Sequence, residues 1–198
     1  MDRVWLLTWT TYGTGLPGDD RGFVTNVRDD TGAAVRHNSP RTPYDRASRG
    51  LVEFARETLA GPPVWLRVEH AAPLAEQLRE TARYRGWTIL ALAVMSNHVH
   101  VVVRVPGDPD PETLLRDFKS YASRRLSAVA GKPAAGTWWT AGGSKRKKAD
   151  DAAVQVAVRY VKNQERPLLV WSPDEEPTGE PGASAPGFSP RVEREPGG

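Results

Sequence analysis

The stretch from Ala91 to Val103 limits the fold more than any other part of this sequence. It is an apolar run that is interrupted once, at Ser96-Asn97-His98, and both halves are rich in β-branched or bulky residues. Two such runs around a short polar break predict a β-hairpin that turns near Ser96-Asn97. Because the flanks are almost entirely apolar, we expect the second strand of this hairpin to lie in the middle of a sheet.

His98 and His100 lie two residues apart on this second strand. Side chains at positions i and i+2 of a strand point to the same face, so both imidazoles should emerge together. Two imidazoles held by a rigid strand make half of a metal site. A His-x-His pair also occurs on ordinary solvated strands. The apolar flanks favour a site here, because buried polar groups without partners are costly.

The rest of the chain supplies the elements around this hairpin. From periodicity and turn residues we expect a strand at 3–12, helices at 51–59, 72–85, 112–130 and 152–164, hairpin strands at 87–94 and 98–105, and short extended pieces at 64–68 and 136–140. Pro73 is expected in the first turn of its helix. This order predicts an α+β fold, a ferredoxin-like split βαβ sandwich with helices on one face of an antiparallel sheet, plus a C-terminal helix.

A length of 198 residues predicts one domain with appendages. We expect the domain to span residues 1–171, with a long irregular loop inserted at about 13–48. Residues 172–198 are rich in Pro, Gly and acidic residues and are predicted to be a disordered tail. The tail holds six acidic and two basic residues, so the net charge of +3 leaves +7 on residues 1–171. A basic body of this kind suggests a polyanionic partner.

Several classes of protein are disfavoured by what the sequence lacks. It has no cysteine, which excludes disulfides, thiolate metal ligands and a cysteine nucleophile. It has no apolar run of about 18 residues for a membrane span and no signal-peptide pattern, so we expect a cytoplasmic protein. Gly131-Lys132-Pro133 lacks the spacing of a phosphate-binding loop, so no nucleotide cofactor is expected.

Tyr160 and Gln164 lie four residues apart on the last predicted helix and share one of its faces. If that face meets the His pair, Gln164 supplies a third metal ligand and Tyr160 lies beside a metal-bound phosphate. The ordinary alternatives are a core tyrosine on an amphipathic helix and a solvated amide near its end.

Taken together, these segments resemble the single-tyrosine HUH transposases, which include the REP-associated tyrosine transposases. His98-Val99-His100, preceded by Met95-Ser96-Asn97, resembles the His–hydrophobic–His motif of that family. Tyr160–Gln164 resembles its late helix, where a nucleophilic tyrosine precedes a metal-binding Gln or Asn by four residues. The opening strand leading into Tyr12–Gly18 is also similar. The resemblance spans roughly residues 3–170, although the loop at 13–48 is longer than in small members and the acidic tail is not part of the pattern.

The resemblance implies an enzyme that nicks single-stranded DNA and transfers strands in DNA transposition, through a covalent 5′-phosphotyrosine. Tyr160 would be the nucleophile, with a divalent metal, Mg²⁺ or Mn²⁺, held by His98, His100 and Gln164. Tyr121 is a rival nucleophile, but it has no amide four residues later, and the family places its tyrosine in the later helix. The alternative functions are a metal-dependent phosphodiesterase without a covalent intermediate and a catalytically silent DNA-binding protein.

Basic and aromatic side chains outside this site are candidates for DNA binding, because Lys and Arg bind phosphates and an exposed Trp stacks on bases. Each also has an ordinary alternative, a solvated charge or a core tryptophan. The predicted DNA-binding residues are Lys119, Arg124, Arg125, Trp138 (or its neighbour Trp139), Lys145, Arg146, Lys147, Lys148 and Arg159. The resemblance further implies hairpin ends on the DNA and leaves both a monomer and a homodimer open.

Overall fold

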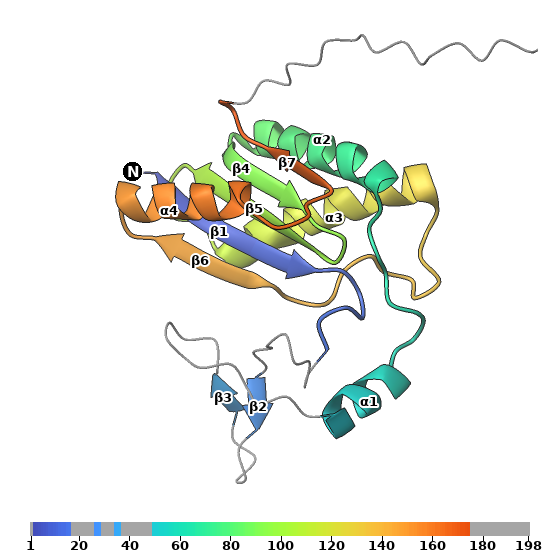
Figure 1. Cartoon of the computed structure of the whole chain (residues 1–198). Helices are drawn as coiled ribbons and strands as arrows, with labels where there is room; N and C mark the ends of the chain where they lie inside the picture. The colour runs from blue at the N-terminus through green and yellow to red at the C-terminus, as the bar shows by residue number, and fades with distance from the viewer. Residues whose placement is uncertain (1, 17–25, 29–33, 37–48, 175–198) are drawn as a thin grey trace, which may run out of the picture.

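The computed structural model describes residues 2–16, 26–28, 34–36 and 49–174. Its centre is a five-stranded sheet in the order β6-β1-β5-β4-β7, in which all neighbours are antiparallel (Figure 1). The strands are β1 (Arg3–Thr10), β4 (Thr88–Val94), β5 (His98–Val105), β6 (Ser144–Lys148) and β7 (Leu169–Trp171). The helices that cover this sheet are α2 (Val68–Arg85), α3 (Pro111–Ala130) and α4 (Asp151–Lys162).

The connections between these elements are those of a split βαβ fold. β1 leads through α2 to β4, the hairpin returns as β5 between β1 and β4, and α3 leads to β6 on the other side of β1. This is the ferredoxin-like plan that the sequence predicts. β5 is the central strand, as the apolar residues around the His pair indicate, and all of the valines that it contributes are buried.

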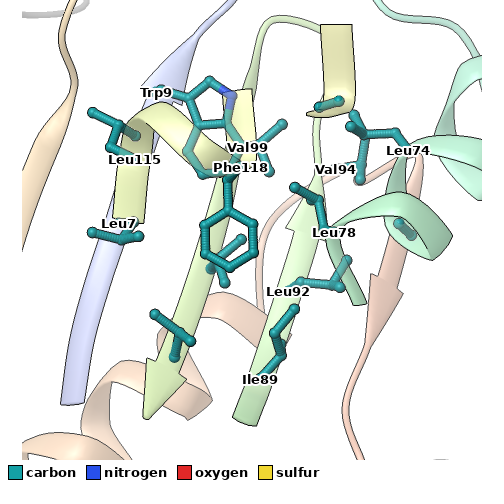
Figure 2. Close-up of a cluster of buried hydrophobic side chains, with 14 of the residues drawn as sticks. Leu7, Trp9, Leu74, Leu78, Ile89, Leu92, Val94, Val99, Leu115 and Phe118 are labelled. Atoms are coloured by element: carbon teal, nitrogen blue, oxygen red, sulfur yellow. The ribbon is translucent and has the colours of Figure 1, made fainter. Parts of the chain in front are cut away.

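The two faces of the sheet carry different layers. On one face, α2 and α3 cover the larger core, where Trp9 and Phe118 stack with ring centroids 6.4 Å apart (Figure 2). On the other face, α4 packs through Val154, Ala157 and Val161. The sheet therefore separates α2 and α3 from α4, and the residues on β5 alternate between the two layers.

The short strand predicted at residues 136–140 lies later in the sequence. Residues 136–140 form a single bridge, Trp139 with Thr11, and the strand beside β1 is instead the basic segment Ser144–Lys148. Gly143 allows this close approach, because a Cβ there would come within 2.8 Å of the Thr8 carbonyl oxygen. A run of Lys and Arg has the composition of a solvated loop, which is why the sequence did not indicate an edge strand here.

Several boundaries also differ from the prediction. α2 begins at Val68 rather than at 72, because the His70 ring accepts a hydrogen bond from the Arg67 backbone N–H at 3.0 Å and so caps its start. Pro73 therefore lies inside the helix. α4 ends at Lys162, which leaves Gln164 just beyond it, and the short strand β7 was not predicted.

The predicted loop at 13–48 is described only in part. Asn26–Arg28 (β2) and Ala34–Arg36 (β3) pair as a small antiparallel ribbon, so this region is not irregular throughout. α1 (Arg49–Glu57) follows it. Of the predicted disordered tail, only residues 172–174 are described, and Ser172 is buried; the remainder lies outside the described residues. Within the described ranges, no helix has both the length and the hydropathy needed to span a membrane.

Candidate active site

The two histidines of β5 point to the α4 face of the sheet. Val102 belongs to the core beneath α4, and His98 and His100 share its face because they differ from it by even numbers of residues. In the register with β1, Thr8 lies opposite His100 and Thr10 lies opposite His98. His100 is buried and His98 is half-buried, so the pair sits where the covered part of the sheet meets solvent.

Each imidazole is oriented by a hydrogen bond at Nδ1. The Nδ1 of His100 lies 2.7 Å from the Thr8 hydroxyl, and the Nδ1 of His98 lies 2.7 Å from the Asn97 side-chain oxygen. The Asn97 oxygen only accepts, which makes His98 a donor at Nδ1, so the lone pair of a neutral His98 ring lies on Nε2. The two Nε2 atoms converge to 2.9 Å. Thr8 and Asn97 thus act as supports for the pair, a role that was not predicted for either residue from the sequence.

Burial keeps His100 neutral. Burial first, and then the neighbouring His98, lower the pKa of the His100 imidazole from 6.5 to about 3, although a side-chain hydrogen bond with Gln164 acts in the opposite direction. A hydrogen bond that raises the pKa stabilises the protonated ring, so the Gln164 amide oxygen accepts this bond from the His100 ring N–H. At neutral pH His100 is therefore an uncharged ring, which is the form that binds metals.

The two rings would be able to hold a divalent ion together. Their Nε2 atoms lie 2.9 Å apart, and the nitrogen of a neutral imidazole is a common metal ligand. No group of three His, Cys, Asp or Glu side chains suited to a metal occurs in the described part of the chain. A third protein ligand would therefore come from another residue type, and the Gln164 amide beside His100 is such a group.

Tyr160 lies beside the same histidines. α4 starts at the N-cap Asp150, whose carboxylate accepts from the Ala153 backbone N–H at 2.7 Å, and its apolar side faces the sheet. Tyr160 is half exposed at the border of that side, and its ring meets the His100 ring edge-on with centroids 5.3 Å apart. Gln164 is held next to it, because its side-chain N–H donates to the Tyr160 carbonyl at 2.9 Å.

An open pocket joins these residues. Its lining includes four residues that were not predicted as site residues from the sequence: Met95, Val156, Asn163 and Glu165. His98, Arg159, Tyr160 and Gln164 complete it. Of the predicted DNA-binding residues, Arg159 alone lines this pocket. The spacing of α4 could have indicated Val156, which lies one turn before Tyr160.

The basic residues predicted on α3 do not reach this site, since α3 lies on the other side of the sheet. The Lys119 ammonium donates to the carbonyls of Thr140 (2.5 Å) and Gly142 (2.9 Å), and burial lowers its pKa. This lysine holds the loop before β6. The rival nucleophile Tyr121 belongs to the same layer. Arg124 stacks over its ring at 5.0 Å, and Arg125 pairs with Glu76 at 3.4 Å.

The predicted stacking of a tryptophan on a DNA base disagrees with the burial of both candidates. Trp138 and Trp139 are each 5% exposed. The indole N–H of Trp138 donates to the Ser127 hydroxyl at 2.9 Å, and that of Trp139 donates to the Lys119 carbonyl at 3.1 Å. Both rings are core residues that fix the loop between α3 and β6, so neither has an open face for a base.

Comparisons with known proteins bear on this site. The family model described as IS200-like transposase matches residues 64–164, half of the chain, and the matched segment contains both histidines, Tyr160 and Gln164. No curated protein matches the chain.

Two solved structures are also similar. A REP-associated tyrosine transposase bound to a REP hairpin is 14% identical with a TM-score of 0.42, and the match covers 81% of this chain and 64% of that one. The chain thus spans less than two thirds of that protein. A protein of Deinococcus radiodurans R1, described as a candidate transposase, is 15% identical with a TM-score of 0.42, and the match covers 83% and 92% of the two chains.

Proposed function

Because the chain belongs to the IS200-like transposase family, we propose that it nicks single-stranded DNA and transfers the cut strand, with Tyr160 as the nucleophile. The observation that carries this proposal is the contact between the Tyr160 and His100 rings, with Gln164 hydrogen-bonded to the backbone of the same tyrosine. A half-exposed phenol next to a pair of converging imidazoles is an arrangement for chemistry on a phosphodiester.

In the proposed reaction the Tyr160 oxygen attacks the scissile phosphorus. A bond forms between the phenol oxygen and the 5′-phosphate, the bond from phosphorus to the 3′ oxygen breaks, and that oxygen leaves with a proton as a 3′-hydroxyl. The phenol proton is lost to the solvent that fills the open pocket. The phosphotyrosine keeps the energy of the broken ester, so the 3′-hydroxyl of another strand reverses the step and joins DNA without a nucleotide cofactor.

His98, His100 and Gln164 would hold a divalent ion, Mg²⁺ or Mn²⁺. Such an ion would draw charge from the scissile phosphate and stabilise the charge that develops on it. The protein's own part is to keep the buried His100 imidazole neutral and to aim both rings at one point, which the Nδ1 hydrogen bonds of the two rings with Thr8 and Asn97 support. Imidazole and amide ligands suit Mn²⁺ better than Mg²⁺, whereas cellular abundance favours Mg²⁺.

The proposed substrate is single-stranded DNA, with hairpin ends as the family resemblance implies. A single strand is narrower and more flexible than a duplex, so its backbone is able to enter an open pocket next to a sheet. Arg159, which lines the pocket and is exposed on α4, is placed to bind such a phosphate.

A covalent adduct tests this proposal. Wild-type protein incubated with single-stranded DNA and Mn²⁺ should give a protein–DNA species that survives SDS, and Tyr160→Phe should give none. Tyr121→Phe is the matched control, because it removes the same oxygen from the other side of the sheet and should leave the adduct intact. Cleaved DNA without any adduct would indicate the phosphodiesterase instead, and bound but uncut DNA would indicate a silent DNA-binding protein.

A further inference from the structure

The four basic residues at 145–148 do not act as one patch, because they lie on a strand. In the register of β6 with β1, Arg146 lies opposite Leu6 and Lys148 lies opposite Val4. Leu6 and Val4 belong to the core beneath α4, and residues directly opposite each other in a sheet share a face. Arg146 and Lys148 therefore point to the same face as His98 and His100.

Lys145 and Lys147 point to the opposite face and are neutralised there. They lie opposite Leu7 and Trp5, which belong to the core beneath α2 and α3. Lys145 forms an ion pair with Glu112, and Lys147 pairs with Asp108 at 2.7 Å. The Lys147 ammonium also lies 5.6 Å from the centroid of the Trp5 ring.

Within the described ranges 2–16 and 49–174, the two cations on the His face, Arg146 and Lys148, are not paired with an acidic side chain. Burial and then the Arg146 charge lower the pKa of the Lys148 ammonium, as expected for like charges on neighbouring positions of one face. Two adjacent cations without an acidic partner favour the binding of an anion.

These cations lie close to the histidines along the sheet. Ser144, two residues before Arg146, lies opposite Thr8, and Thr8 lies opposite His100. Arg146 is thus two residues along and two strands across from His100, roughly 12 Å between Cα positions at about 3.4 Å per residue and 4.8 Å per strand. In Figure 1, β6 forms the lower edge of the sheet next to β1, and α4 begins where β6 ends.

We propose that the single DNA strand reaches the His98–His100 site along the edge strand β6, with its phosphates bound by Arg146 and Lys148, while Lys145 and Lys147 take no part. This inference rests on the proposed function, since the polyanion it invokes is the substrate of that site. It gives the substrate a path: over the basic edge of the sheet, past Ser144 and Thr8, to the histidines.

Two double variants with the same loss of charge test this path. Arg146→Gln/Lys148→Gln and Lys145→Gln/Lys147→Gln each remove two positive charges from the same strand, one from each face. Binding of a fluorescein-labelled oligothymidylate is measured by anisotropy across a range of salt concentrations, with EDTA present so that no strand is cut. The logarithm of the association constant falls linearly with the logarithm of the salt concentration, and each lost phosphate contact makes this slope shallower by about 0.7.

The slope should fall by about 1.4 for Arg146→Gln/Lys148→Gln and stay at the wild-type value for Lys145→Gln/Lys147→Gln. The single change Arg146→Gln, at an exposed edge position, should lower it by about half as much, and Arg146→Lys should restore it. Equal changes in both double variants, or no change in the first, would overturn the proposed path. The adduct assay on wild-type protein is a separate test. If the salt slopes of the two double variants differ but no adduct forms, the proposed chemistry is refuted and the path is not. If an adduct forms but the two slopes are equal, the path is refuted and the chemistry is not.

Discussion

Replacing Thr8 with Val tests whether the sheet itself prepares the metal site. The change keeps the size and the β-branched shape of the side chain, so the strand should persist. It removes the hydroxyl that lies 2.7 Å from the His100 Nδ1, and His100 is only 4% exposed. A buried ring nitrogen without a partner costs about 1–3 kcal/mol. Loss of a partner that orients a metal ligand typically weakens metal affinity by about 10–100-fold, or about 1.4–2.7 kcal/mol.

The assay is the Mn²⁺ concentration that gives half-maximal nicking. We expect Thr8→Val to raise it by about 10–100-fold, with much of the rate recovered at saturating metal. Thr81→Val is the matched control, because it removes a buried hydroxyl that donates to the Gln77 carbonyl at 2.8 Å on α2, far from the histidines. It should lower stability without changing the metal dependence. The same metal dependence in both variants would refute the supporting role of Thr8.

Two further predictions concern pH and the source of the nucleophile. Because the folded pKa of His100 lies near 3 and its ordinary value is 6.5, the unfolded chain binds the extra proton in acid, so stability is full above pH 6.5 and falls towards pH 3. Between pH 7 and pH 5 the free energy of unfolding of the metal-free wild-type protein, measured with urea, should fall by about 2 kcal/mol more than that of His100→Asn. An equal fall in the two proteins would exclude His100 as the cause. α4 is joined to the sheet at both ends, because it follows β6 after two residues and leads to β7 at the opposite edge. This connection holds Tyr160 over the sheet of its own chain, so we expect it to act with the histidines of that chain. Mixing Tyr160→Phe with His98→Ala should therefore give no adduct, and a restored adduct would show that one chain supplies the tyrosine to another.

The parts of the fold that could be predicted are those in which apolar and polar residues alternate with the period of a strand or a helix. The apolar hairpin with its polar break placed His98 and His100 on one face of a central strand, and helix spacing placed Tyr160 and Gln164 together. These inferences depend on local periodicity, which a sequence records directly. The structure brings all four side chains together, although Gln164 does so from just beyond the end of α4.

The rest depends on strand register, which a single sequence does not record. Thr8 supports His100 only because β1 pairs with β5 in one particular register. The segment 144–148 has the composition of a solvated loop, and its pairing with β1 divides its charges between two faces. Trp138 stands in a Gly-rich, basic neighbourhood in the sequence and yet is buried. In each case a tertiary contact overrides what the local composition favours.

The central claim is that Tyr160 becomes linked to the 5′ end of cut DNA, and peptide mapping of the adduct tests it most directly. After a single turnover with Mn²⁺, nuclease and protease digestion followed by mass spectrometry should find a nucleotide joined through its 5′-phosphate to the peptide that contains Tyr160. Cut strands together with an unmodified Tyr160, or a nucleotide on the peptide that contains Tyr121, would contradict the account.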